Sequence, residues 1–279
     1  MTTDNRIYTY ERFFPAERLA AFVKFFYYFH GTGDQSERIV PQSLAEITFN
    51  LGTGTAKSFI IPPGHQPYFV VPGHLHRVLG ICLHPWGLHA LFKLPPGQLA
   101  ETKIPVADAL PVAGREMTDR ISNKSSPREM ITSLEDYLVS QIGNMPTGHS
   151  DNGYSGNGSS GGLLIRDALK FIDSHHGLID LPTFYNRYSQ STRRLQMIFE
   201  QSIGMSPKKY SRLKRFHYTL TQLTARTGQT TGLTSLALDT GYYDQAHFIH
   251  EFKAFAGTHP GGFLQESNQL NAINARSWF

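Results

Sequence analysis

The stretch GLTSLALDTGYYDQAHFIHEFKAFAGTHPGGF, residues 232–263, contains two helical patterns of apolar residues joined by a short turn. The first pattern is formed by Leu233, Leu236 and Ala237. It ends at Gly241, which can adopt the left-handed backbone that a sharp turn needs. The second pattern is formed by Phe248, Phe252 and Phe255 at i, i+4 and i+7. Asp244 is a suitable N-cap for it, and Gly257 with Pro260 beyond ends it. The stretch therefore predicts two short helices packed across a tight turn.

Two helices joined by a glycine-bearing turn have the layout of a helix-turn-helix. Ala237 leaves room for the two helices to approach closely. With the phenylalanines in the core, the opposite face of the second helix carries Gln245, Ala246, Ile249 and His250. Such a charge-poor face suits a DNA major groove, where Gln pairs with adenine and an apolar group contacts a thymine methyl. The same pattern also fits two ordinary amphipathic helices. The upstream sequence is needed to choose between these two interpretations.

A second unit of this kind precedes the first. Asp180 is a suitable cap for the helix LPTFYNRY, and Ser191 caps the helix TRRLQMIFEQSIG, which ends at Gly204. The core-facing residues of the latter helix are Leu195, Ile198 and Phe199. The sequence therefore predicts two helix-turn-helix units, with a helix over 192–201 in the first and a helix over 244–255 in the second.

A long helix is predicted between the two units, over residues 206–226. Ser206 is its N-cap and Pro207 its first residue. About 20 residues at 1.5 Å each span roughly 30 Å, which approaches the roughly 34 Å of one B-DNA turn. The basic residues on this helix are Lys208, Lys209, Arg212, Lys214 and Arg215. They are candidates for DNA phosphate contacts, which position a protein without reading sequence, and a solvated basic face is the alternative.

The N-terminal part reads as strands. Five short apolar or alternating segments end in Gly or Pro: ERIVPQ, EITFNLG, SFIIPPG, PYFVVPG and HRVLGICLH. They predict a sandwich or barrel, preceded by a segment, 15–30, that starts like a helix at PAERLAAFVKFF and ends like a strand. Helical patterns at 108–119 and 126–142 form a small appendage. The Gly/Ser/Asn-rich run 143–162 predicts a flexible linker. We expect an α+β chain with a β-rich domain at 1–142 and an all-α domain at 163–279.

Composition is that of a globular protein of about two domains, with 40% hydrophobic and 17% charged residues in 279. No apolar run reaches the about 18 residues of a membrane span, and no secretory signal is apparent. The single Cys82 excludes an internal disulfide and favours a reducing compartment, so we expect a cytoplasmic protein. Residues 163–279 hold 13 Lys and Arg against 8 Asp and Glu, whereas residues 1–162 hold 13 against 14. The basic excess lies in the helical part, as polyanion binding requires.

The sequence carries little indication of catalysis or metal binding. Histidines gather at His65, His74, His76, His84 and His89. His74 and His76 on one strand would share a face, as in a metal site, but no glutamate follows at the usual place. No hydrolase, nucleotide or dinucleotide motif is present. We therefore predict no enzyme, no catalytic residue, no metal and no cofactor. The alternative function is a small-molecule or metal-binding sensor whose N-terminal domain carries the main activity.

The double helix-turn-helix resembles the DNA-binding domain of the AraC/XylS family of bacterial transcription regulators, over residues 163–264. The most specific segments are GMSPKKYSRLKRF (204–216) and LALDTGYYDQAHFIHEFKAFAGTHPGGF (236–263). The resemblance implies that the helices over 192–201 and 244–255 are recognition helices. It implies base contacts from Arg193, Gln196, Met197, Gln245, Ala246, Ile249 and His250. Arg194 joins the basic residues of the long helix as a phosphate candidate.

Three departures from the family pattern lie in the first unit. Tyr185 occupies the position where the family has a small Ala. Ser189 occupies the position of the turn glycine, and Met197 that of a common Arg. The N-terminal part looks like a β-rich sensor domain found fused to such DNA-binding domains, on the segments 40–52 and 79–101. The partners expected from the resemblance are promoter DNA, RNA polymerase, a small-molecule effector of unknown chemistry and a second copy of the chain, with no membrane.

Overall fold

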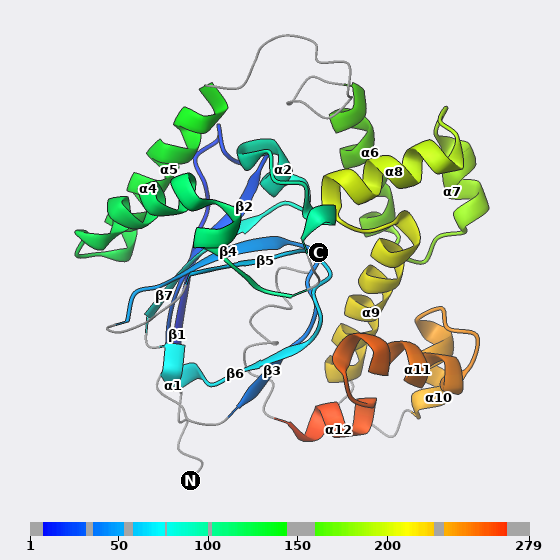
Figure 1. The fold of residues 1–279 in the computed structure, drawn as a ribbon. Coiled ribbons are helices and arrows are strands. Elements are labelled where there is room, and N and C mark those ends of the chain that lie inside the picture. The colour runs from blue at the N-terminus through cyan, green and yellow to red at the C-terminus, as the bar shows by residue number, and fades with distance from the viewer. Residues whose placement is uncertain are drawn as a thin grey trace.

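A computed structural model of the chain describes residues 8–31, 36–52, 58–75, 77–99, 102–143, 160–225 and 232–266. A β-rich N-terminal part lies beside an all-helical C-terminal part (Figure 1). The predicted α+β organisation is confirmed. Most of the predicted linker, residues 144–159, lies outside the described residues.

The main sheet has six antiparallel strands in the order β1-β2-β7-β4-β5-β8. These are β1 (Tyr8–Phe13), β2 (Val23–Gly31), β4 (Ala45–Asn50), β5 (Phe59–Ile61), β7 (Arg77–Leu83) and β8 (Ile104–Pro105). A second, two-stranded sheet pairs β3 (Glu37–Ile39) with β6 (Tyr68–Val70). The five predicted strand segments, which correspond to β3 to β7, are confirmed.

The structure corrects one expectation near the N-terminus and adds one strand that was not predicted. The helix predicted from PAERLAAFVKFF is absent, since residues 17–22 form turns and β2 starts at Val23. Phe25 and Phe26 are both buried, on opposite faces of the sheet, which needs the two-residue period of a strand. Strand β1, which pairs with β2 along its whole length, was not predicted.

Helices cover one face of the main sheet (Figure 1). They include α2 (Gly87–Phe92), α4 (Pro111–Ser122) and α5 (Pro127–Gly143) (Figure 1). The 3-10 turn η1 (Pro96–Gln98) precedes β8, α3 (Val106–Ala109) follows it, and α1 (Pro72–Leu75) precedes β7. Buried Ile47, Leu79 and Ile81 of the sheet share one core with Met117 of α4 and Leu134 of α5. The predicted helical appendage is therefore a structural layer of the domain.

The C-terminal part consists of α6 (Ser160–Ser174), α7 (Leu181–Arg187), α8 (Thr192–Ile203), α9 (Pro207–Ala225), α10 (Leu233–Asp239), α11 (Gln245–Ala256) and α12 (Pro260–Gln265). The long α9 connects the pair α7–α8 to the pair α10–α11 (Figure 1). The four predicted caps are confirmed: Asp180, Ser191, Ser206 and Asp244 each accept a backbone N–H from the first turn of their helix. Gly204 and Gly257 end α8 and α11 in the left-handed conformation.

The two parts of the chain are packed together. Val40, next to β3, is fully buried in the helical core with Phe216 and Phe252. Trp86 packs against both the helical core and the core under the sheet. In the described ranges, no helix combines the length and the apolar character that crossing a bilayer requires.

Candidate nucleic-acid interface

The face of α11 that points away from the core carries the second set of predicted base-reading residues. Ala246 and His250 are exposed, and Lys253 continues the same stripe one turn on. Gln245 is half-buried, and its side-chain oxygen accepts a hydrogen bond from the Thr234 hydroxyl at 2.5 Å. Ile249 is also half-buried because it packs against the helical core. The open part of this face is therefore centred on Ala246 and His250.

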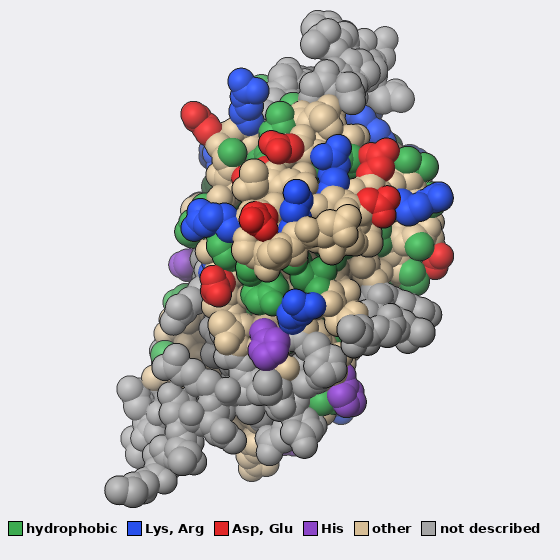
Figure 2. All heavy atoms as spheres, turned by 90° about the vertical axis from the view of Figure 1, so that its left-hand side faces the viewer, with side chains coloured by type: hydrophobic (Ala, Val, Ile, Leu, Met, Phe, Trp, Pro, Cys, Tyr) green, Lys and Arg blue, Asp and Glu red, His purple; other side chains and the backbone are tan. Residues whose placement is uncertain are grey.

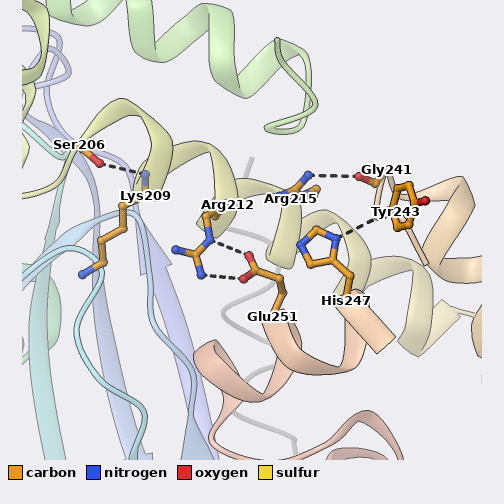
Figure 3. Close-up of polar contacts among 8 residues, drawn as sticks. All are labelled: Ser206, Lys209, Arg212, Arg215, Gly241, Tyr243, His247 and Glu251. Atoms are coloured by element: carbon orange, nitrogen blue, oxygen red, sulfur yellow. Dashed lines mark hydrogen bonds and ion pairs between the residues drawn. The ribbon is translucent and has the colours of Figure 1, made fainter. Parts of the chain in front are cut away.

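Tyr243 is a surface residue of this unit that the sequence patterns did not single out. It is 86% exposed and stands directly before α11, while its neighbour Tyr242 is buried in the core. Its backbone N–H donates to Nδ1 of His247 at 3.3 Å (Figure 3). The available signal was the Tyr-Tyr pair itself, because adjacent residues in a short turn rarely both face the core.

The first unit presents α8 in the same manner. Arg193 and Arg194 are exposed in its first turn, and Met197 is 38% exposed one turn further. The amide of Gln196 donates to the Tyr185 hydroxyl at 3.3 Å. The departure at position 185 therefore has a visible consequence, since the larger residue engages one of the predicted base readers. Ser189, another of the three departures, lies exposed in the bend between α7 and α8.

Two arginines of α9 hold the second unit instead of facing solvent freely (Figure 3). Arg212 donates from Nε and Nη2 to both carboxylate oxygens of Glu251 on α11, at 2.6 and 2.8 Å. Burial raises the pKa of Glu251, but the hydrogen bonds and charge of Arg212, together with His247 and Arg215, hold that pKa below its ordinary value. Arg215 donates to the carbonyl of Gly241 at 3.2 Å, and its guanidinium lies 4.8 Å from the Tyr242 ring centroid.

The three lysines of α9 differ in environment. Lys214 is 2% exposed, and its ammonium lies 3.2 Å from the Asp173 carboxylate. Burial lowers the pKa of Lys214, and Asp173 opposes that shift. Lys209 extends toward the strands of the N-terminal part (Figure 3). Lys208 is exposed. Lys214 in this arrangement has no path to a phosphate.

The N-terminal part contacts both helix-turn-helix units. Arg38 of β3 pairs with Glu266 after α12 through two hydrogen bonds of 2.7 and 2.8 Å. Buried His217 of α9, whose pKa burial lowers to about 3, donates from Nε2 to the Pro41 carbonyl at 2.8 Å. A methyl group at Gly97 of η1 would lie 2.5 Å from the carbonyl oxygen of Glu200, so η1 and α8 are in backbone contact.

On the opposite side of the molecule, Lys and Arg side chains lie among Asp and Glu side chains (Figure 2). The mixed charge of that side does not form a continuous basic surface, so it gives no second candidate for a polyanion contact.

The strand placement predicted for His74 is wrong. His74 is exposed in α1, and His76 lies outside the described residues. Burial lowers the pKa of both His65 and His84 to about 4, so these rings are neutral. Across the described ranges, no three His, Cys, Asp or Glu side chains gather in a way that could hold a metal ion.

Two helix-turn-helix units with exposed recognition faces, joined by one rigid helix, define a DNA-binding transcription regulator. Residues 185–266 match a family model described as "Helix-turn-helix domain", which is of the AraC type. Residues 185–266 thus form an AraC-type helix-turn-helix domain, and the chain is a DNA-binding transcription regulator with a β-rich N-terminal part. Residues 11–105 match a second model, "Domain of unknown function (DUF6597)".

Three solved structures are similar to the chain. A probable AraC family transcriptional regulator from Rhodopseudomonas palustris CGA009 is 22% identical, with a TM-score of 0.33, over 37% of this chain and 95% of that one. ToxT from Vibrio cholerae O395 is 11% identical, with a TM-score of 0.38, over 93% and 98%. Wild-type ToxT from Vibrio cholerae strain SCE256, bound to an unsaturated fatty acid, is 11% identical, with a TM-score of 0.37, over 95% and 98%. No curated protein matches the chain.

Proposed function

We propose that α8 and α11 enter two successive major grooves on one side of a promoter duplex. The observation that carries this proposal is the placement of two N-capped helices at opposite ends of α9 (Figure 1). Helix α9 has 19 residues, which corresponds to about 28 Å at 1.5 Å per residue. That length is close to the roughly 34 Å between equivalent grooves of B-DNA.

The proposed base-reading residues are those predicted from the sequence: Arg193, Gln196, Met197, Gln245, Ala246, Ile249 and His250. Gln196 and Gln245 each make an internal hydrogen bond, so they reach a base only by exchanging or sharing that bond. A carbonyl oxygen has a second lone pair, which lets Gln245 keep Thr234 while it accepts from adenine. We add Tyr243 as a residue placed to contact the sugar-phosphate backbone beside α11, because it is exposed and carries a hydroxyl.

The proposed phosphate contacts are fewer than the sequence predicted. Arg194 and Lys208 are exposed and stay in the proposal. Lys214 leaves it because the side chain is buried against Asp173. Arg212 and Arg215 leave it because they tie α9 to the second unit, and Lys209 because it extends toward the N-terminal domain.

The test is selection of bound fragments from a random-sequence duplex library, with the full chain. The full chain is needed because Val40 and Pro41 of the N-terminal domain complete the helical core. We expect two enriched blocks about one helical turn apart. Gln245→Ala should relax preference at one base pair, by about 1–3 kcal/mol, whereas Gln201→Ala at the far end of α8 should leave the motif unchanged. One enriched block alone, or no change with Gln245→Ala, would contradict the proposal.

We propose in addition that the N-terminal domain holds a small-molecule effector and that the protein acts in the cytoplasm. A cavity between the main sheet and the β3–β6 sheet supports the effector. Contacts with RNA polymerase and with a second copy of the chain remain predictions of the family resemblance.

A further inference from the structure

The cavity between the two sheets has a volume of about 160 Å³. It exists because strand alternation turns one set of side chains toward β3 and β6 and the other set toward the helices. Its walls are aromatic, with Tyr10, Phe25, Tyr27, Phe59 and Tyr68 among the lining residues. An apolar cavity of about 150 Å³ accommodates benzene, so this space fits one aromatic ring and a short substituent.

Glu46 of β4 is the acidic residue in this lining. Its carboxylate accepts a hydrogen bond from the Tyr27 hydroxyl, and within the described part of the chain this is its one hydrogen-bond partner. Burial raises the pKa of Glu46 to about 6, and only the Tyr27 hydrogen bond opposes that shift. Near neutral pH this half-buried carboxylate has no countercharge paired with it in the described part of the chain, which is costly unless a cation or strong donor meets it.

The protein's own cations lie at the edges of the cavity. Lys103 is exposed, and its ammonium lies 4.9 Å from the Phe59 ring centroid and 5.7 Å from that of Tyr68. Arg12 lies 4.7 Å from the Phe25 ring centroid. Neither forms an ion pair or a hydrogen bond with Glu46 within the described part of the chain.

His65 adds a hydrogen-bond acceptor to the lining. Nδ1 of His65 lies 2.8 Å from the Gln66 carbonyl, so it carries the proton and leaves Nε2 as an acceptor. An ammonium group offers three donors and no acceptor. Aromatic faces also attract cations through their quadrupoles. Acceptors, a single carboxylate and aromatic walls together define the recognition chemistry of an organic cation.

We propose that this cavity binds a small arylalkylamine as its ammonium ion, with the ring among the tyrosines and phenylalanines and the ammonium at Glu46. The proposal deepens the effector role above and rests on it. The volume limits the ligand to about one ring with a short chain, which excludes long acyl chains. Cys82 and His65 are neutral in this lining, so its charged groups are Glu46 and the exposed Lys103.

Isothermal titration calorimetry on the full chain tests this with three probes of one skeleton: 2-phenylethylamine, 2-phenylethanol and phenylacetate. We expect the amine to bind about tenfold or more tightly than the anion. Glu46→Gln should weaken the amine by about tenfold or more and leave the alcohol nearly unchanged. Glu11→Gln is the matched control, since Glu11 is exposed on β1 and does not line the cavity.

Three outcomes would overturn the proposal: equal binding of anion and amine, unchanged amine affinity in Glu46→Gln, or no binding of any probe at millimolar concentration. If Glu46→Gln does not fold by near-ultraviolet circular dichroism, the comparison of the three probes on the unaltered chain decides. DNA binding is measured on the same preparation. If the protein binds DNA but not the amine, only the amine-binding proposal is refuted. If it binds the amine but not DNA, only the DNA-reading proposal is refuted.

Discussion

Arg212 and Lys208 are two basic residues of α9 one turn apart, and replacing each should affect a different property. Replacing Arg212 should lower stability, and replacing Lys208 should weaken the salt-dependent part of DNA binding. Arg212 holds Glu251 of α11 with two charge-assisted hydrogen bonds, whereas Lys208 is exposed. Breaking a buried ion pair costs about 3–5 kcal/mol and breaking an exposed one at most about 1 kcal/mol. The Glu251 side chain is 9% exposed and that of Arg212 34% exposed. We therefore expect Arg212→Ala to lower the free energy of unfolding by about 2–3 kcal/mol.

Urea unfolding of the full chain, followed by circular dichroism, measures this loss. Glu251→Gln and the double variant complete a double-mutant cycle, in which the coupling isolates the ion pair. Lys208→Ala should change stability by less than about 0.5 kcal/mol. It should instead lower the salt dependence of DNA binding, with the slope of log K against log salt reduced by about 0.9. A stable Arg212→Ala variant with a reduced salt slope would refute the reasoning and restore Arg212 to the phosphate contacts.

The remaining predictions concern the cavity. The pKa of Glu46 is raised to about 6, so its protonated form stabilises the fold at low pH. That stability, about 2 kcal/mol, is lost as pH rises through 6. Glu46→Gln should abolish this loss, which urea unfolding at several pH values measures. Amine affinity should fall as pH drops below about 6, because protonated Glu46 carries no charge; a flat calorimetric profile would contradict this. Gly80→Ala should weaken amine binding, because a Cβ there would meet the Tyr27 ring, and unchanged affinity would count against Tyr27 as a wall.

Local signals made the helical domain predictable. Asp180, Ser191 and Asp244 cap their helices as expected because a cap involves only residues three apart in the chain. The apolar stripes of α8 and α11 likewise follow from spacing alone. The strands β3 to β7 were predictable from alternation and from the Gly and Pro residues that follow them. Strand β1 was missed although its sequence, YTYERF, is rich in residue types that favour strands.

Long-range contacts explain what the sequence could not provide. The basic stripe of α9 looks uniform in sequence, yet Arg212 finds its partner 39 residues later on α11. Lys214 finds Asp173 on α6. Such pairings depend on how the helices cross, which residue spacing within α9 does not encode. The cavity was equally hidden, because Glu46 and Tyr27 come from separate strands that only the sheet order brings together.

Residues 38–42 lie between the cavity and the DNA-binding helices and contact both. Arg38 and Pro41 hold the DNA-binding domain through Glu266 and His217, while Ile39 and Gln42 line the cavity. A ligand in the cavity that displaces Ile39 or Gln42 would also displace Arg38 and Pro41. It would therefore change the packing of α9 and α12 against the N-terminal part. Thermodynamic linkage then requires the converse. DNA that favours one packing arrangement of α9 and α12 changes the affinity of the cavity for its proposed ligand by the same factor.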